Sequence, residues 1–300
     1  MIAVVTGALS YSGKYITREL IARGYTVRTL TGHPGRPNPF GAAVEVLPFN
    51  FERPEALVES LSGASVIFNT YWIRFERGAM TFGRAINNLK LLIDAARRAG
   101  VARFVHTSIT GADARSPLPY FRGKGVIEEY LRGAGIGYAI VRPALIFGPE
   151  DVLINNIAWL LRRSRLFGVP GDGAYRVQPV FVEDLARLEV EAAAPGANLE
   201  IDAAGPESYR FTDLVRAVGG TIGRPPLIVH LSPQTMLLTA RLVGWMTGDI
   251  VLTRDEIRGL MSDLLVASGA PTAPTRLSEW MARNAATLGL AYASETARRA

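Results

Sequence analysis

The chain contains no cysteine, and this absence removes several classes of chemistry. Without cysteine there is no disulfide, no thiolate zinc site, no iron–sulfur cluster and no cysteine nucleophile. Histidine is also scarce: the three present, His33, His106 and His230, lie far apart, and no two have the spacing of metal ligands. The sequence therefore predicts no metal site, and the lack of cysteine fits a cytoplasmic location.

Long apolar runs are lacking as well. No stretch of about 18 apolar residues occurs, so we expect no transmembrane segment. The first residues carry no basic region of the kind that opens a signal peptide. The 300 residues are nevertheless 48 % hydrophobic and 20 % charged, which is typical of a soluble globular protein with a sizeable core.

Lysine is scarce too, with three copies among the 33 lysines and arginines. The formal net charge of +6 raises the question of nucleic-acid binding. However, the arginines are spread along the chain, and runs such as Arg97-Arg98 and Arg162–Arg165 are short. Such pairs are typical of solvated helix faces and helix C-termini. We therefore expect no nucleic-acid partner.

The first 150 residues alternate short β-branched runs with amphipathic segments, which predicts a doubly wound parallel α/β sheet of the Rossmann type. The predicted strands are Ile2–Val5, Thr26–Thr31, Val44–Leu47, Ser65–Asn69, Val101–Ser108 and Tyr138–Arg142. The predicted helices between them are Ser12–Arg23, Pro54–Leu61, Phe82–Ala99 and Tyr120–Arg132.

After residue 150 the rhythm becomes mixed, which indicates a second, smaller domain. We expect a dinucleotide-binding domain over residues 1–150, with residues 176–194 returning to it. A small mixed domain over residues 151–175 and 195–300 would bind the substrate, and it would include a strand at Leu199–Asp202. The apolar stretch Met236–Met246 has three interpretations: core, which is the default, the roof of a pocket for a hydrophobic substrate, or a membrane contact.

The strongest local signal is the turn that follows the first predicted strand. Gly7 allows a tight turn, the main chain at Tyr11 and Ser12 can face a pyrophosphate, and Gly13 lets the helix approach the strand. Ser10 stands where the dinucleotide fingerprint has its middle glycine. The pattern predicts a dinucleotide site, and the alternative is an ordinary strand–helix turn that needs glycines.

The end of the second predicted strand bears on the choice of cofactor. A carboxylate there would bind the ribose 2′-hydroxyl of NAD, whereas an arginine would favour the 2′-phosphate of NADP. The segment after Thr31 contains His33 and Arg36 and no carboxylate. This favours NADP(H), with NAD(H) as the alternative.

Tyr120 and Lys124 form a YxxxK pattern on a predicted helix. Residues four apart share one helix face, so the phenol and the ammonium can point into one site. A nearby ammonium favours the phenolate, which makes a tyrosine usable as a proton donor and acceptor. The alternative is an aromatic–lysine pair on the surface.

Polar and aromatic residues follow the fourth predicted strand, at the sheet edge where ligands bind in open α/β folds. We expect Asn69 or Thr70 to contact the cofactor, and Tyr71 and Trp72 to line the substrate site. Asn155 and Asn156 are further candidates for polar substrate contacts. Packing of a loop is the alternative for the two aromatic residues.

Together these motifs resemble the short-chain dehydrogenase/reductase superfamily, most closely its extended and atypical branch of epimerase/dehydratase-like proteins and relatives of a nucleotide-binding accessory subunit of respiratory complex I. The resemblance covers most of the chain. The matching segments are Thr6–Gly13, Val44–Leu57, Phe104–Ser108, Tyr120 with Lys124, Val141–Pro149, Val180–Ala186 and Ala204–Glu207.

The resemblance implies roles for individual residues. Tyr120 would be the general acid/base, Lys124 would hold the nicotinamide ribose and tune Tyr120, and Ser108 would polarise the substrate oxygen, with Thr110 in reserve. The cofactor would be contacted by three further residues: Asn50 and Phe51 on the adenine side, and Pro143 beside the nicotinamide.

The resulting leading hypothesis is an NAD(P)-dependent oxidoreductase that transfers hydride to or from a carbonyl or hydroxyl carbon of a small molecule. An NAD(P)-dependent epimerase or dehydratase is the second hypothesis. A non-catalytic NAD(P)H-binding sensor or assembly subunit is the third, and the departure at Ser10 favours it. The resemblance also implies a homodimer.

Overall fold

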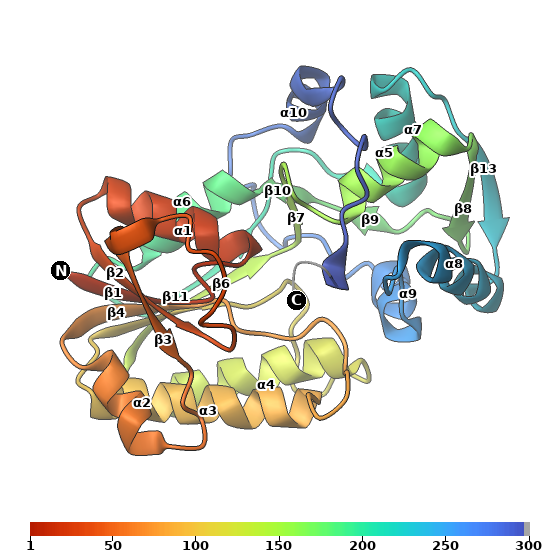
Figure 1. Ribbon diagram of the computed structural model, residues 1–300. Helices are drawn as coiled ribbons and strands as arrows, with labels where there is room; N and C mark the ends of the chain where they lie inside the picture. The colour runs from red at the N-terminus through yellow and green to blue at the C-terminus, as the bar shows by residue number, and fades with distance from the viewer. Residues whose placement is uncertain (297–300) are drawn as a thin grey trace. The chain divides into compact units, whose positions relative to one another are not determined.

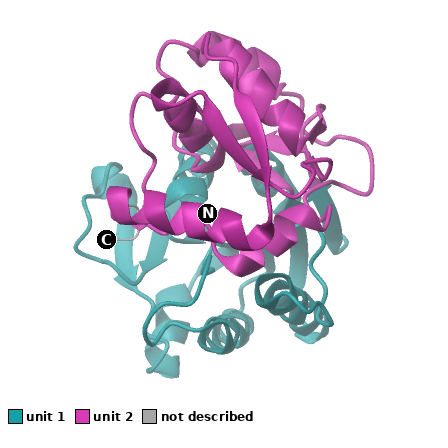
Figure 2. Ribbon diagram, turned by 90° about the vertical axis from the view of Figure 1, so that its right-hand side faces the viewer, with its two compact units in different colours: residues 1–143, 185–202 teal, residues 144–184, 203–300 magenta. Residues whose placement is uncertain are grey.

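A seven-stranded sheet organises the first part of the chain (Figure 1). The computed structural model describes residues 1–296 and divides into unit 1, residues 1–143 and 185–202, and unit 2, residues 144–184 and 203–300 (Figure 2). The order of strands across the sheet is β11-β6-β5-β4-β1-β2-β3. The strands are β1 (Ile2–Thr6), β2 (Thr26–Thr31), β3 (Val44–Pro48), β4 (Ala64–Asn69), β5 (Arg103–Thr107), β6 (Gly137–Pro143) and β11 (Leu199–Ala203).

Helices cover both faces of this sheet. In Figure 1, α2, α3 and α4 lie on one face and α1 and α6 on the other. The five strand pairs from β6 across to β3 are parallel. The predicted Rossmann-type α/β fold is therefore confirmed. The helices are α1 (Tyr11–Ala22), α2 (Pro54–Leu61), α3 (Phe82–Arg98), α4 (Pro119–Gly133) and α6 (Val182–Ala192), and a short 3-10 helix η1 covers Gly41–Ala43.

The central strands are buried on both faces, which explains why they are apolar runs rather than alternating ones. Phe68 of β4 and Phe104 of β5 are almost completely buried. Arg103 of β5 is a charged residue among these buried side chains, and its guanidinium donates hydrogen bonds to three main-chain carbonyls that follow α6 or end it. This satisfies the donors of a buried cation and fastens residues 192–197 to the sheet.

The sequence prediction for the segment near residue 199 was wrong. Leu199–Asp202 was assigned to the small domain, but β11 forms the edge of the central sheet beside β6. Conversely, residues 176–184, which were expected to return to the first domain, are in unit 2. The observed boundaries follow residues 143, 184 and 202 rather than 150, 175 and 194.

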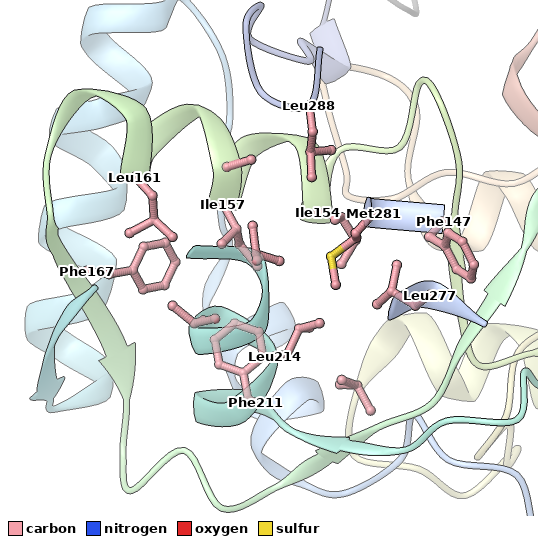
Figure 3. Packing of buried hydrophobic residues seen from close by; sticks show 14 of the residues in the cluster. Phe147, Ile154, Ile157, Leu161, Phe167, Phe211, Leu214, Leu277, Met281 and Leu288 are labelled. Atoms are coloured by element: carbon pink, nitrogen blue, oxygen red, sulfur yellow. The ribbon is translucent and has the colours of Figure 1, made fainter. Parts of the chain in front are cut away.

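In its described part, up to residue 296, unit 2 is built on short strand pairs and five helices around its own core. Figure 3 shows that side chains of α5, α7 and α10 meet in this core, among them Ile157, Leu214 and Met281. β10 pairs with β7 and β13 with β8 in parallel, and β12 pairs with β9 antiparallel. The elements are β7 (Leu145–Phe147), β8 (Leu166–Pro170), β9 (Arg176–Val177), β10 (Pro179–Phe181), β12 (Tyr209–Arg210), β13 (Leu227–Leu231), α5 (Leu153–Arg163), α7 (Phe211–Thr221), α8 (Pro233–Thr247), α9 (Arg254–Met261) and α10 (Leu277–Asn284).

The default interpretation of Met236–Met246 as core was wrong for one face of α8. Only Ala240 and Gly244 of this helix are buried, whereas Leu242 and Trp245 are largely exposed. Over residues 1–296, no helix combines the length and apolar character needed to cross a membrane.

Candidate functional site

The turn between β1 and α1 is as tight as the predicted phosphate loop requires. Gly7 has a φ of +76°, a left-handed conformation that other residues rarely adopt. A Cβ atom on Gly13 would overlap the carbonyl oxygen of Gly7, so the first turn of α1 can approach β1 this closely only with glycine at position 13. Gly7 therefore allows the tight turn and Gly13 the close approach of helix and strand, as the dinucleotide fingerprint requires.

Ser10, at the middle position of the fingerprint, turns its side chain back into the loop. Its Oγ donates a hydrogen bond to the Gly7 carbonyl oxygen at 2.5 Å, and its N–H donates to the same oxygen at 2.8 Å. Ser10 is the N-cap of α1, but its side chain accepts no capping hydrogen bond. The hydroxyl is therefore bonded within the loop and does not cap the helix N-terminus.

Thr6 joins the ends of β1 and β4. Its Oγ1 donates to Oδ1 of Asn69 at 3.1 Å and accepts the main-chain N–H groups of Thr70 and Tyr71. The sequence order diverges from β1 in both directions across the sheet, so this is the switch point where ligands bind in open α/β folds. Thr70 lies beside the turn, with its Oγ1 3.4 Å from where a Cβ of Gly7 would stand.

Asn69 has no exposed surface, and its amide links β1 to β5. Its Nδ2 lies 2.9 Å from Nδ1 of His106, while its Oδ1 accepts from Thr6. Burial, followed by the charges of Lys124 and Arg142, holds the pKa of His106 well below its ordinary value, so this ring is neutral. Asn69 is thus committed to the sheet. Thr70 is bonded to β1 as well, because its Oγ1 donates to the carbonyl oxygen of Thr6, so this hydroxyl could only accept a hydrogen bond from a ligand.

Aromatic side chains gather after β3 and β4. Phe49 stacks on Phe51 with ring centroids 4.8 Å apart, and the edge of Tyr71 meets Phe49 at 5.0 Å. Beside them, Asn50 adopts a φ of +51°, unusual for a residue other than glycine, and its Oδ1 accepts from Arg53. Asn50 and Phe51 therefore lie in one loop after β3. Tyr71, which was predicted to line the substrate site, packs its ring against Phe49 and Phe51 of this loop.

His33 and Arg36 lie in a turn after β2. The N–H of Arg36 donates to the carbonyl of His33, and the N–H of His33 donates to Oγ1 of Thr31. The side chain of His33 is exposed and that of Arg36 is half-buried. Both are in unit 1 with the phosphate loop, at the end of the strand adjacent to β1.

Trp72 joins Tyr120 and Lys124 at the start of α4. The Trp72 and Tyr120 rings meet edge to face at 6.0 Å, and Nζ of Lys124 lies 4.9 Å from the centroid of the Trp72 ring. Gly123 makes this possible, because a Cβ there would lie 2.7 Å from the indole. The predicted YxxxK pair is thus accompanied by an aromatic wall, and Lys124 is only 3 % exposed beneath it.

Thr107, the last residue of β5, connects Lys124 to a buried carboxyl group. Nζ of Lys124 donates to the Thr107 carbonyl oxygen at 2.6 Å, and Oγ1 of Thr107 donates to Oε1 of Glu189 at 2.7 Å. Burial lowers the pKa of Lys124 to about 7 and raises the pKa of Glu189 to about 7. With a pKa of about 7, each of these two groups can gain or lose a proton near neutral pH.

Ser108 takes part in a different buried network. Its hydroxyl donates to Oε1 of Glu128 at 2.6 Å, and Glu128 also receives two hydrogen bonds from the guanidinium of Arg142. Arg142 continues to Glu200 of β11, so the network ties α4, β6 and β11 together. Because the single hydroxyl hydrogen of Ser108 is already donated, this serine can only accept a hydrogen bond from a ligand.

The remaining predicted residues fall in two places. Thr110 is almost completely buried, and its N–H donates to the carbonyl of Pro143, so these two lie together after β5 and β6. Asn155 and Asn156 belong to unit 2. There Asn155 donates to the carbonyl of Gly148, and the Asn156 amide pairs with the main chain of Ala293. Both asparagines thus have structural partners within their own unit.

Sequence reasoning missed the two buried acids of the site. Glu128 follows Lys124 by four residues, so it shares the helix face that carries the lysine inward. Glu189 stands among buried neighbours, between Ala186 and Val190 of α6. In both cases a carboxylate on the apolar face of a helix was the available signal.

Comparisons with known proteins bear on the family that the chain resembles. Residues 1–148 match the model of the NmrA-like family. The NADH dehydrogenase (ubiquinone) 1 alpha subcomplex subunit 9, mitochondrial, of Arabidopsis thaliana is 25 % identical over 291 residues, which cover 90 % of this chain and 72 % of the relative. The predicted resemblance to the extended branch of the short-chain dehydrogenase/reductase superfamily is confirmed.

Two further proteins illustrate the similarity. Ceramide reductase of Caulobacter vibrioides is 29 % identical over 243 residues, which cover 80 % of this chain and 76 % of the relative. Among solved structures, the NADPH-dependent quinone oxidoreductase of Escherichia coli, determined with NADPH, has a TM-score of 0.75 at 21 % identity, covering 94 % of this chain and 99 % of that chain. At this identity the structural match establishes the shared fold.

Proposed function

We propose that the protein is an NAD(P)-dependent oxidoreductase in which Tyr120 is the acid/base that serves a carbonyl or hydroxyl group of a small molecule. The observation that carries this proposal is the grouping of Tyr120 with Lys124 on α4, in the same unit as the turn that Gly7 and Gly13 shape. The similarity to a ceramide reductase supports a reductase.

The cofactor would lie along the carboxyl ends of the strands of unit 1. The first turn of α1 would hold the pyrophosphate, Asn50 and Phe51 the adenine side, and Lys124 the nicotinamide ribose. When bound, the reduced nicotinamide supplies a hydride. His33 and Arg36, with no carboxylate in the turn after β2, favour the 2′-phosphate of NADP(H) over NAD(H).

Tyr120 would donate its phenolic proton to the substrate oxygen as hydride reaches the carbonyl carbon, and it would accept that proton in the reverse reaction. Lys124 would favour the phenolate when protonated and help return the proton. The hydroxyl of Ser108 already donates its hydrogen to Glu128, so Ser108 would not donate a proton to the substrate. Tyr120 alone would donate to the substrate oxygen.

Replacing Tyr120 tests the mechanism. We expect Tyr120→Phe to lower kcat by at least about 10²-fold, as loss of a general acid does, without changing the Kd for NADPH. Tyr138→Phe is the matched control because it removes a phenol from β6 in the same unit. Turnover of Tyr120→Phe at the wild-type rate, with quinone or aldehyde substrates, would remove Tyr120 from the mechanism.

A second candidate function is cofactor binding without turnover, as in an accessory or assembly subunit. Two observations favour it: Ser108 is committed to Glu128, and Lys124 is covered by Trp72. The similarity to the complex I subunit points the same way. This candidate predicts NADPH binding with no conversion of any substrate. An epimerase or dehydratase would instead convert substrate with no net change in nicotinamide absorbance.

A further inference from the structure

One face of α8 exposes large apolar side chains that unit 2 does not cover. Leu238, Leu242, Trp245 and Met246 are exposed to 63 %, 60 %, 82 % and 72 %. Their spacing of i, i+4, i+7 and i+8 places them on a single stripe of the helix. The buried residues Ala240 and Gly244 lie on the opposite side, so the orientation of α8 in unit 2 turns the stripe outward.

The helix is a stable, well-delimited element rather than a frayed segment. Ser232 caps its N-terminus by accepting the N–H of Thr235, Pro233 occupies the first turn, and Gly248 ends it in a left-handed conformation. α8 packs beside the strand pair β8–β13, where a Cβ on Gly168 would lie 3.6 Å from Sδ of Met236. On the strand face that carries Gly168, Leu227 and its partner Leu166 are each 60 % exposed.

The segment of chain that carries the stripe is basic. Between Asp213 and Asp249 the chain contains no acidic residue, whereas it contains Arg216, Arg224 and Arg241. Arg241 is exposed on α8 and lies at the margin of the stripe, about 60° around the helix from Leu238. There its aliphatic stem can follow apolar material while its guanidinium reaches an anion.

An outward apolar stripe that contains tryptophan, with Arg241 at its margin on a helix that has no acidic residue, matches the chemistry of an anionic lipid surface. A helix of 15 residues is too short to span a bilayer but can lie in its plane. We propose that α8 is a membrane-docking helix that places Leu238, Leu242, Trp245 and Met246 in the headgroup region of an anionic bilayer. This proposal is independent of the proposed oxidoreductase activity.

Sedimentation with large vesicles tests the proposal. We expect the full chain to pellet with phosphatidylcholine vesicles that contain about 30 % phosphatidylglycerol, and to bind pure phosphatidylcholine at least about tenfold more weakly. Trp245→Glu should reduce binding to the anionic vesicles at least about tenfold. Leu290→Glu is the matched control, because Leu290 is 59 % exposed, lies outside α8 and receives the same charge. It should bind as the wild type does.

Two further measurements show whether Trp245 itself enters the membrane and whether the variant is folded. Addition of anionic vesicles should shift tryptophan emission to shorter wavelength, and Trp245→Phe should lose most of that shift because Trp245 is 82 % exposed. Trp245→Glu should keep the wild-type circular dichroism spectrum and melting temperature, which shows that it folds. Absence of wild-type binding, or equal binding by Trp245→Glu, would overturn the proposal. So would a wild-type dimer that Trp245→Glu converts to a monomer, because the stripe would then be a contact between copies.

Discussion

Gly13 is the single residue on which the phosphate loop depends most. Any side chain at this position would displace the Gly7 carbonyl, to which both donors of Ser10 are bonded. The atom that a Cβ on residue 13 would meet belongs to the main chain of Gly7. A shift of a flexible side chain therefore cannot relieve the overlap.

We expect Gly13→Ala to lose NADPH binding and to reduce the free energy of unfolding by about 1–3 kcal/mol, the usual cost of overpacking. Isothermal calorimetry and chemical denaturation measure the two effects. Gly133→Ala is the control, since Gly133 ends α4 with open space around it. Wild-type affinity in Gly13→Ala would show that the turn is not the cofactor site.

The buried pair of Lys124 and Glu189 makes stability depend on pH in a specific way. Glu189 keeps its proton in the folded chain up to about pH 7, whereas an unfolded glutamate releases it near 4.5. The free energy of unfolding therefore falls as pH rises through this window. Lys124 acts in the opposite sense between about pH 7 and 10.5, where only the unfolded chain holds the proton.

Glu189→Gln should remove the fall in stability between about pH 4.5 and 7, an effect of about 2–3 kcal/mol, because the amide cannot ionise. Denaturation at a series of pH values measures it. Glu191→Gln, on the same helix but with an exposed side chain, should retain the wild-type profile. An unchanged profile in Glu189→Gln would mean that this carboxyl ionises normally in the folded chain.

At the scale of elements, the arginine–glutamate network explains how β11 is held at the edge of the sheet. Glu128 of α4 is almost completely buried and receives Arg142 of β6, which also contacts Glu200 of β11. Hydrogen bonds from Arg132 lower the pKa of Glu200 to about 2, so this carboxylate stays charged. Removal of Arg142 would leave Glu128 as a buried charge with fewer partners.

We therefore expect Arg142→Met to reduce the free energy of unfolding by about 3 kcal/mol. Arg84→Met breaks an exposed ion pair with Glu52 and should cost less than about 1 kcal/mol. Chemical denaturation distinguishes the two. Equal stability of Arg142→Met and wild type would show that the network does not hold β6 and β11 together.

α2 and β11 show which features of the fold could be predicted from the sequence and which could not. α2 begins and ends where predicted, because Pro54 and the following Glu55 mark its first turn locally. β11 was assigned to the wrong unit because it follows a break in the alternation of strands and helices. The partner of its Glu200, Arg142, is 58 residues away, a contact that no local pattern reveals.

The residues of the candidate site that belong to local motifs were predicted, whereas the contacts between distant residues were not. Gly7, Gly13 and the Tyr120–Lys124 pair have local spacings that can be recognised in a sequence. The cover that Trp72 forms over Lys124 joins residues 52 positions apart, and the bond from Ser108 to Glu128 joins different elements. Such contacts depend on the packing of α4 against the sheet rather than on a pattern.

At the scale of the whole molecule, unit 1 is assembled from two separate stretches of chain. A chain that ends at Pro143 would lack α6 and β11, which supply Glu189 and the carbonyls that satisfy the buried Arg103. We expect such a chain to unfold without cooperativity in circular dichroism melts and not to bind NADPH. A sharp transition with retained binding would show that residues 1–143 fold alone.

Calorimetric titration of the full chain with NADPH and, separately, with NADH tests the central claim most directly. The account predicts binding in the micromolar range, tighter for NADPH because His33 and Arg36 follow β2 without a carboxylate, and lost in Gly13→Ala. A folded wild-type protein that binds neither nucleotide would contradict both the oxidoreductase and the non-catalytic cofactor-binding functions.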